Sequence, residues 1–171
     1  MKKVTVVLTL FLLVMLTCSG CGEKNPLYQQ VRDALDREDP DNLKITIYYM
    51  DPDVQYRAYP TLEQLTEPDS VSVTVYNLDG ERIFSSLQVI KNELKDYMIV
   101  PTEPAKHENA RVYYVLETKH GEKILELLLE GVEPTCVYFN GTEVECNAIY
   151  YRIIKACIGA PISRGLHGNY K

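Results

Sequence analysis

The stretch RVYYVLET (residues 111–118), followed by KHGE (119–122) and KILELLLE (123–130), decides the fold of this chain. The two flanking segments are rich in aliphatic residues and tyrosine, which favours β-strands. The four polar residues between them predict a hairpin, so the two strands should pair antiparallel. A second pair of this kind, residues 135–139 and 142–145, surrounds the turn signal Asn140-Gly141. These hairpins predict an antiparallel sheet.

Two further strand signals lie upstream of the hairpins. Residues 44–50 alternate between apolar and more polar side chains, which is the period of a strand with one buried face. Residues 71–76 place a valine at every second position. The dipeptide Asp79-Gly80 then predicts another hairpin turn, with residues 81–84 as the returning strand.

Helix signals flank these strands. Asn25 can cap a helix that has Pro26 in its first turn, which predicts a helix over 26–38. Residues 61–65 fit a single helical turn. The last helix signal is the apolar stripe of residues 149–157, with Gly159 and Pro161 as stop signals.

A capping-box pattern marks one more helix start. It consists of a serine followed three positions later by a glutamine, at Ser85 and Gln88. Leu87, Ile90 and Leu94 follow at helical spacing. The pattern predicts a helix over 86–96 and assigns Ser85 and Ser86 to capping.

The order of these elements predicts an α+β fold, with an antiparallel sheet of about five to seven strands and helices packed on it. The alternative is an all-β sandwich or barrel with peripheral helices, which three capped helices argue against. The predicted domain occupies residues 26–159, and residues 160–171 form a flexible C-terminal tail.

The amino terminus has the pattern of an export signal. Lys2 and Lys3 precede the apolar run 4–16, and small residues follow that run. At 1.5 Å per helical residue the run covers about 20 Å, short of the 30 Å core of a bilayer. We therefore predict that residues 1–20 are a signal peptide rather than a membrane span.

Cys21 follows Ser19-Gly20, and residues 18–21 resemble the lipobox of bacterial lipoproteins. Gly20 fits the small residue before the cysteine, whereas Cys18 departs from the leucine usual three places earlier. The resemblance implies cleavage before Cys21 and a diacylglyceryl group on that cysteine. Two acyl chains anchor a protein stably. The alternative is an ordinary cleaved signal peptide with a free Cys21 thiol.

The predicted partner of the anchor is a bacterial membrane, and the predicted location is extracytoplasmic. Residues 21–25 would be a very short tether. Removal of Lys2 and Lys3 with the signal leaves 16 basic against 24 acidic residues, a net charge of −8. An acidic chain repels phosphate backbones, so nucleic acid is excluded as a partner.

Cys136 and Cys146 flank the turn signal Asn140-Gly141, and an exported protein can form disulfides. A three-residue loop would place the two cysteines opposite one another, and we predict a Cys136–Cys146 disulfide on that basis. A two-residue loop would pair Cys136 with Glu145 and point the cysteines to opposite faces. The alternative is that both are reduced packing cysteines. Cys157 belongs to the apolar stripe of the last helix and is predicted to be a core thiol.

The sequence contains no recognisable catalytic or metal-binding motif. None of the three histidines has metal-ligand spacing, and no serine nucleophile elbow is present. Asp51 and Asp53 follow the strand 44–50, yet acidic loop residues are more often solvated than metal-bound. We predict no catalytic residue, no metal and no cofactor.

These observations favour a non-catalytic, lipid-anchored domain that binds a protein, peptide or glycan of the cell envelope. The thirteen tyrosines suit both sheet packing, which we weigh more heavily, and a binding face for sugars or peptides. One alternative is a tethered hydrolase of envelope polymers, with Asp51 and Asp53 as candidate carboxylates. Another is an accessory subunit of an envelope complex. A flat tyrosine-lined face would favour binding, and a deep cleft with two converging carboxylates would favour the enzyme.

Overall fold

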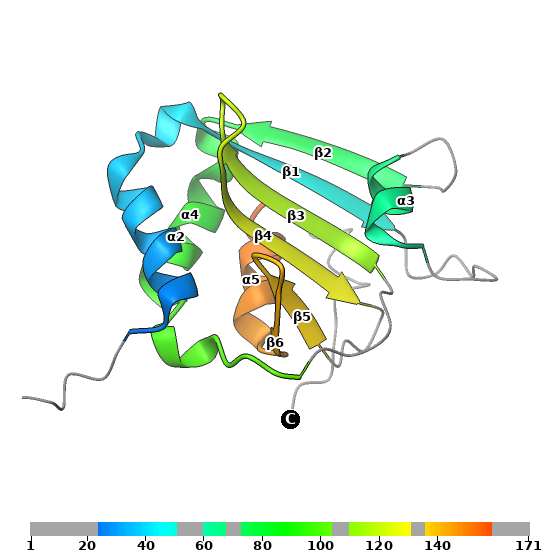
Figure 1. The fold of residues 1–171 in the computed structure, drawn as a ribbon. Coiled ribbons are helices and arrows are strands. Elements are labelled where there is room, and N and C mark those ends of the chain that lie inside the picture. Colours follow the sequence, from blue (N-terminus) through cyan, green and yellow to red (C-terminus); the bar gives the residue numbers. More distant parts are fainter. Residues whose placement is uncertain (1–23, 51–59, 68–72, 104–109, 131–135, 159–171) are drawn as a thin grey trace, which may run out of the picture.

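A computed structural model describes residues 24–50, 60–67, 73–103, 110–130 and 136–158. It consists of a six-stranded antiparallel sheet in the order β2-β1-β3-β4-β5-β6, with helices packed on it (Figure 1). The strands are β1 (Leu43–Met50), β2 (Val73–Asp79), β3 (Ala110–Thr118), β4 (Lys123–Glu130), β5 (Cys136–Phe139) and β6 (Thr142–Glu145). The helices are α2 (Pro26–Arg37), α3 (Leu62–Thr66), α4 (Glu81–Glu93) and α5 (Ala148–Lys155), with 3₁₀ turns η2 (Pro40–Asn42) and η3 (Asp96–Met98). The predicted α+β fold is confirmed.

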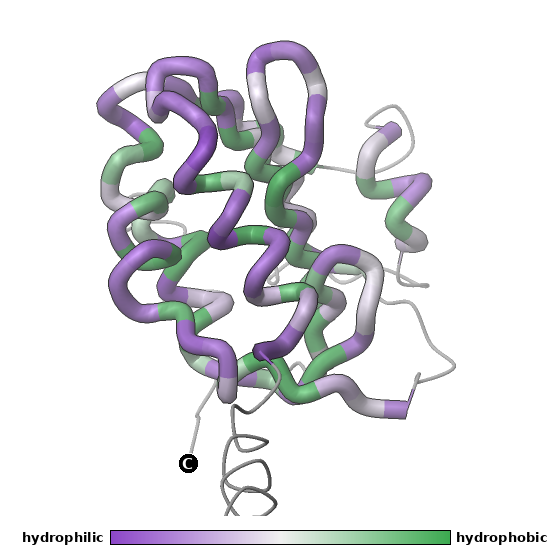
Figure 2. The backbone as a smooth tube through the Cα atoms, turned by 60° about the vertical axis from the view of Figure 1, so that its left-hand side comes forward, coloured by the Kyte–Doolittle hydropathy of each residue, from purple (hydrophilic) through white to green (hydrophobic). Residues whose placement is uncertain are grey.

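One face of the sheet carries the main hydrophobic core. On β1 this face presents Ile45 and Ile47, and the register places Leu116 and Tyr114 of β3 beside them. Helices α2, α4 and α5 cover this face, because their apolar stripes belong to the same buried cluster as these strand residues. Along the helices, hydrophobic and hydrophilic stretches alternate, as expected for helices with one buried side (Figure 2). The opposite face, called the open face below, is covered by α3 at one end.

The predicted strand at residues 81–84 is wrong, because these residues form the first turn of α4. Gly80 precedes the helix with φ 54° and ψ −130°, a conformation that glycine adopts readily. The chain therefore turns directly into a helix whose Ile83 and Leu87 are buried against the sheet. Burial of this helical stripe outweighs the local hairpin signal of Asp79-Gly80.

The predicted capping role of the two serines is also wrong. Both lie inside α4, and Ser86 is fully buried. Its hydroxyl donates to the carbonyl oxygen of Ile153 in α5 at 2.9 Å and lies 3.0 Å from the hydroxyl of Tyr114. Ser86 thus joins α4 to α5 and to strand β3.

The predicted Cys136–Cys146 disulfide is not present in the structure. Cys146 is a free thiol, and so is Cys157. The register of β5 and β6 pairs Phe139 with Thr142 and Cys136 with Glu145, which is the register of a two-residue loop. Asn140 accommodates this tight turn with a φ of 46°. The predicted disulfide required a three-residue loop, so the observed two-residue turn explains why it is absent.

Among the described residues, none of the helices has the length and apolar character needed to cross a bilayer.

Candidate functional site

The open face of the sheet carries the candidate site. The strand residues that alternate with those of the main core point to this face. Helix α3 lies across β1 and β3 at one end of it. Thr61 begins α3 with a reciprocal capping box to Gln64. The cap holds Leu62 and Leu65 of α3 against the open-face residues of the strands.

A pair of tyrosines occupies the middle of the open face. Tyr48 of β1 and Tyr113 of β3 are direct neighbours in the register. Their rings stack with centroids 6.0 Å apart and planes inclined by 25°. Such pairs contribute about 0.5–1.5 kcal/mol beyond their buried area, so the two rings stiffen one another.

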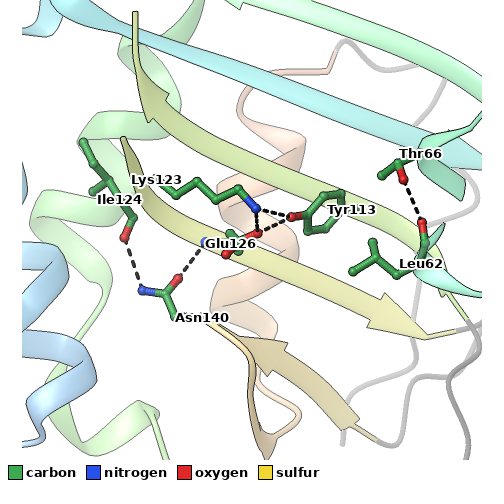
Figure 3. A network of polar contacts seen from close by, with 7 residues as sticks. All are labelled: Leu62, Thr66, Tyr113, Lys123, Ile124, Glu126 and Asn140. Carbon is green, nitrogen blue, oxygen red and sulfur yellow. Dashed lines mark hydrogen bonds and ion pairs between the residues drawn. The ribbon is translucent and has the colours of Figure 1, made fainter. Parts of the chain in front are cut away.

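A polar network adjoins this pair (Figure 3). The hydroxyl of Tyr113 donates to the carboxylate of Glu126. The ammonium of Lys123 lies 2.7 Å from the same carboxylate and 3.4 Å from the Tyr113 hydroxyl. Asn140, in the turn between β5 and β6, fixes the backbone of Glu126 by accepting from its amide at 2.7 Å. The network therefore sits on a braced part of β4.

A β-bulge places Lys123 and Glu126 on the same face. In a regular strand two residues three positions apart point to opposite faces. Here the pairing of β3 with β4 shifts by one residue between Leu116 and Glu117. The extra residue on β4 leaves both Ile124 and Leu125 buried in the main core and turns Lys123 back to the open face.

Tyr113 and Lys123 of this network keep one protonation state at neutral pH. Burial, with the hydrogen bond to Glu126, raises the pKa of Tyr113 to about 12. The hydrogen bond to Glu126 raises the pKa of Lys123 as well. Tyr113 therefore remains a neutral hydroxyl and Lys123 a cation. A proton-transfer role would need a pKa closer to neutral, so these two groups suit recognition better than acid–base chemistry.

Two shallow hollows lie on either side of Tyr113 and Leu62, which line both. One, of about 300 Å³, is also lined by Glu126, Leu128, Tyr138 and Gly141. The other, of about 420 Å³, is also lined by Thr46, Tyr48, Thr66, Val115, Glu117 and Lys123. Together they form what we call the tyrosine groove, which runs across β1, β3, β4 and β5. With strands about 4.8 Å apart, it extends over about 14 Å.

The charged side chains that line the tyrosine groove, Lys123, Glu126 and Glu117, are balanced once Lys44, which lies beside the groove on β1, is included. Lys123 is paired with Glu126, and Glu117 is paired with Lys44 at 3.3 Å. These pairs leave hydroxyl, carboxylate and ammonium groups as hydrogen-bonding partners beside the apolar side chains Leu62, Val115 and Leu128. An arrangement of this kind can hold a ligand that is polar but carries no net charge.

Most of the residues singled out in the sequence lie elsewhere. Cys21, Asp51 and Asp53 fall outside the described residues, as do two of the three histidines, His107 and His167. His120 is an exposed turn residue between β3 and β4. Within the described part of the chain, no group of three or more histidine, cysteine or acidic residues could hold a metal ion.

The sequence reasoning missed Lys123 and Glu126 as site residues. A signal for Glu126 was present, because it is the single charged residue inside the apolar run of residues 124–129. The signal for Lys123 was absent, since its position on the open face depends on the bulge.

No family model matches this chain, and neither a curated protein nor a solved structure matches it.

Proposed function

We propose that this protein is a lipid-anchored, extracytoplasmic domain of the bacterial cell envelope that binds an uncharged glycan in the tyrosine groove. The anchor would be the lipid on Cys21. The observation that carries the binding proposal is the braced Tyr113–Glu126–Lys123 network on the floor of an open groove.

The chemistry of the groove supports a glycan over a charged ligand. A charged ligand would need an uncompensated opposite charge, whereas the lysines and glutamates here are paired with one another. A sugar offers hydroxyl groups to the network and apolar ring faces to Tyr48 and Leu62. The dimensions suit a short oligosaccharide, since the groove crosses four strands.

The alternative is a tethered hydrolase that cleaves an envelope polymer. Its candidate carboxylates, Asp51 and Asp53, lie outside the described residues. A hydrolase would convert the glycan, whereas the proposed binding domain would return it unchanged. The two functions therefore differ in the mass of the recovered ligand.

The test uses the purified lipoprotein in lipid nanodiscs. Glycan fragments released from envelope material are incubated with the immobilised protein, and the retained fragments are identified by mass spectrometry. We expect uncharged oligosaccharides to be retained with unchanged mass. Shortened fragments would support the hydrolase, and retention of peptides alone would contradict the glycan assignment.

Variants locate the binding site. Tyr48→Ala removes a half-buried ring that lines the groove, and we expect about tenfold weaker binding, equivalent to about 1.4 kcal/mol. Glu126→Gln should also weaken binding, because it removes the charge that orients Lys123. The matched control is Phe84→Ala, which removes an exposed aromatic ring on α4. Equal binding by Tyr48→Ala and the control would show that the ligand binds elsewhere.

A further inference from the structure

The described chain begins at one end of the helix layer, where it is clamped to η3. The amide of Asn25 donates to the carboxylate of Asp96 at 2.8 Å, and its side-chain amide donates to the carbonyl of Ile99 at 2.7 Å. The side-chain oxygen of Asn25 accepts from the amide of Leu27 and caps α2. The entry point of the chain is therefore fixed relative to η3.

The proposed anchor lies very close to this entry point in the sequence. Three peptide links separate Cys21 from Lys24. A fully extended chain gains at most about 3.6 Å per residue, so the two Cα atoms lie no more than about 11 Å apart. A lipid on Cys21 would thus hold Lys24 within about that distance of the lipidated residue, and η3, which contacts Asn25, would lie beside it.

This surface exposes apolar side chains beside basic ones. Tyr97 is 74% exposed and Val100 is 39% exposed, and each neighbours a residue that contacts Asn25. Lys24 and Lys95 are also exposed. We call these four residues the η3 patch. Among the described residues, the other exposed large apolar side chains are Val75, at 36%, and Phe84, at 58%.

The side chains of the η3 patch suit the surface of a bilayer. Tyrosine has an apolar ring and a polar tip, and it concentrates at membrane–water interfaces. Lysines near the surface are attracted to anionic lipid headgroups, which matters in a chain whose overall charge is negative. The patch is also rigid, because the Val100 carbonyl accepts from the amide of Glu145 at 2.8 Å.

We propose that the η3 patch contacts the phospholipid surface that holds the lipid of Cys21, so that the domain docks on the membrane by this end. The inference rests on the proposed lipid anchor. Two apolar side chains bury too little area to bind a membrane on their own. A tether of about 11 Å makes the contact intramolecular, with an effective concentration in the millimolar range. The η3 patch of the anchored protein would therefore contact the bilayer even though the contact is weak by itself.

The absence of tryptophan from the sequence offers a clean probe. Tyr97→Trp introduces a single tryptophan into the patch, and Phe84→Trp introduces one as the matched control. Phe84 lines a hollow with Pro40 and Asp41, which follow the far end of α2. That helix has twelve residues and is about 18 Å long, so the control reports on the opposite end of the helix layer.

Each full-length lipoprotein is reconstituted into vesicles of phosphatidylcholine and phosphatidylglycerol, with and without brominated acyl chains. Flotation of the vesicles tests the anchor, and tryptophan emission tests the docking. We expect both variants to float. The emission of Tyr97→Trp should shift to shorter wavelength and be quenched by brominated lipid, whereas that of Phe84→Trp should change in neither respect.

The outcomes separate the two proposals. Floating protein with unquenched Tyr97→Trp emission would overturn the docking while leaving the anchor intact, and would assign the patch to solvent or to a protein partner. Equal quenching of the two variants would also overturn it, because the domain would then have no preferred end. Protein that does not float would refute the anchor and, with it, the docking.

Discussion

The buried contact between Ser86 and Tyr114 predicts that replacing Tyr114 restores part of the stability lost when Ser86 is replaced. The Ser86 hydroxyl has one hydrogen, and it is directed to the carbonyl of Ile153 at 2.9 Å. Tyr114 must therefore be the donor in the 3.0 Å contact between the two hydroxyls. All three groups belong to residues with no exposed surface. Burial also raises the pKa of Tyr114 well above its usual value, so the phenol stays protonated.

The magnitudes follow from which polar groups each variant leaves without a partner. Tyr114→Phe removes one hydrogen bond and strands no donor, so it should lower the free energy of unfolding by about 1 kcal/mol. Ser86→Ala strands both the Tyr114 hydroxyl and the Ile153 carbonyl, at about 2–4 kcal/mol. In the double variant the Tyr114 hydroxyl is gone, while the Ile153 carbonyl and the Cys157 thiol, which also bonds to Ser86, lose their partner just as they do in Ser86→Ala alone. The double variant should therefore be about 1–2 kcal/mol more stable than Ser86→Ala alone.

Urea denaturation followed by circular dichroism measures the four free energies of unfolding. The matched control combines Ser86→Ala with Tyr150→Phe, which removes a hydroxyl that donates to the carbonyl of Met98 at 2.8 Å. The two sites share no hydrogen-bond partner, so the control effects should add within about 0.5 kcal/mol. The reasoning is refuted if Tyr114→Phe destabilises the Ser86→Ala protein as much as it destabilises the wild type.

Three further predictions concern single features of the fold. Gly80→Ala should lower the free energy of unfolding by about 1–3 kcal/mol in urea titrations, because alanine strains at a φ of 54° although no atom lies within 4 Å of the added carbon. Thr61→Ala breaks the capping box of α3 and should cost about 1 kcal/mol; faster amide exchange confined to α3 would verify it, and unchanged exchange there would contradict it. The pKa of Tyr113 is raised to about 12, so its contribution to stability is complete below pH 10 and is lost as the pH rises through 12. Denaturation at several alkaline pH values should show a smaller loss for Tyr113→Phe than for the wild type, and an identical loss would count against the assigned environment.

Elements whose signals are local could be predicted from the sequence. The alternation of residues 44–50 and the two apolar runs of residues 111–130 fixed strands β1, β3 and β4 to within a residue or two. Helix α2 followed from its cap and helix α5 from its apolar stripe in the same way. In these segments propensity, period and capping all agree with the tertiary packing.

The start of α4 shows where such reasoning fails. The Asp79-Gly80 signal for a hairpin competes with an apolar stripe that begins at Ile83. Only the tertiary structure decides the competition, because the stripe gains its burial from α5 and from the sheet. The same packing converts Ser86 from an apparent cap into a buried hydrogen-bonding residue.

The tyrosine groove could not be predicted because it depends on register between distant segments. Tyr48 and Tyr113 lie 65 residues apart and become neighbours only through the pairing of β1 with β3. The bulge that brings Lys123 to Glu126 depends on how the β3–β4 hairpin closes. A strand pattern gives the alternation of faces but not the partner strand, so cross-strand sites are invisible to it.

The same sheet separates the two surfaces for which we propose roles. Helix α2, which follows the proposed tether, packs on the side of the main core, and the tyrosine groove lies on the opposite face. Strand β4 serves both, since Leu125 and Leu127 meet the helix layer while Glu126 and Leu128 line the open face. A domain docked through the η3 patch would keep its helix layer next to the anchor. The tyrosine groove, on the other face of the sheet, would not be covered by the anchor. Because most residues that line the groove belong to strands of the sheet, with α3 at its edge, a ligand would find it largely formed, and binding would require little reordering of the chain.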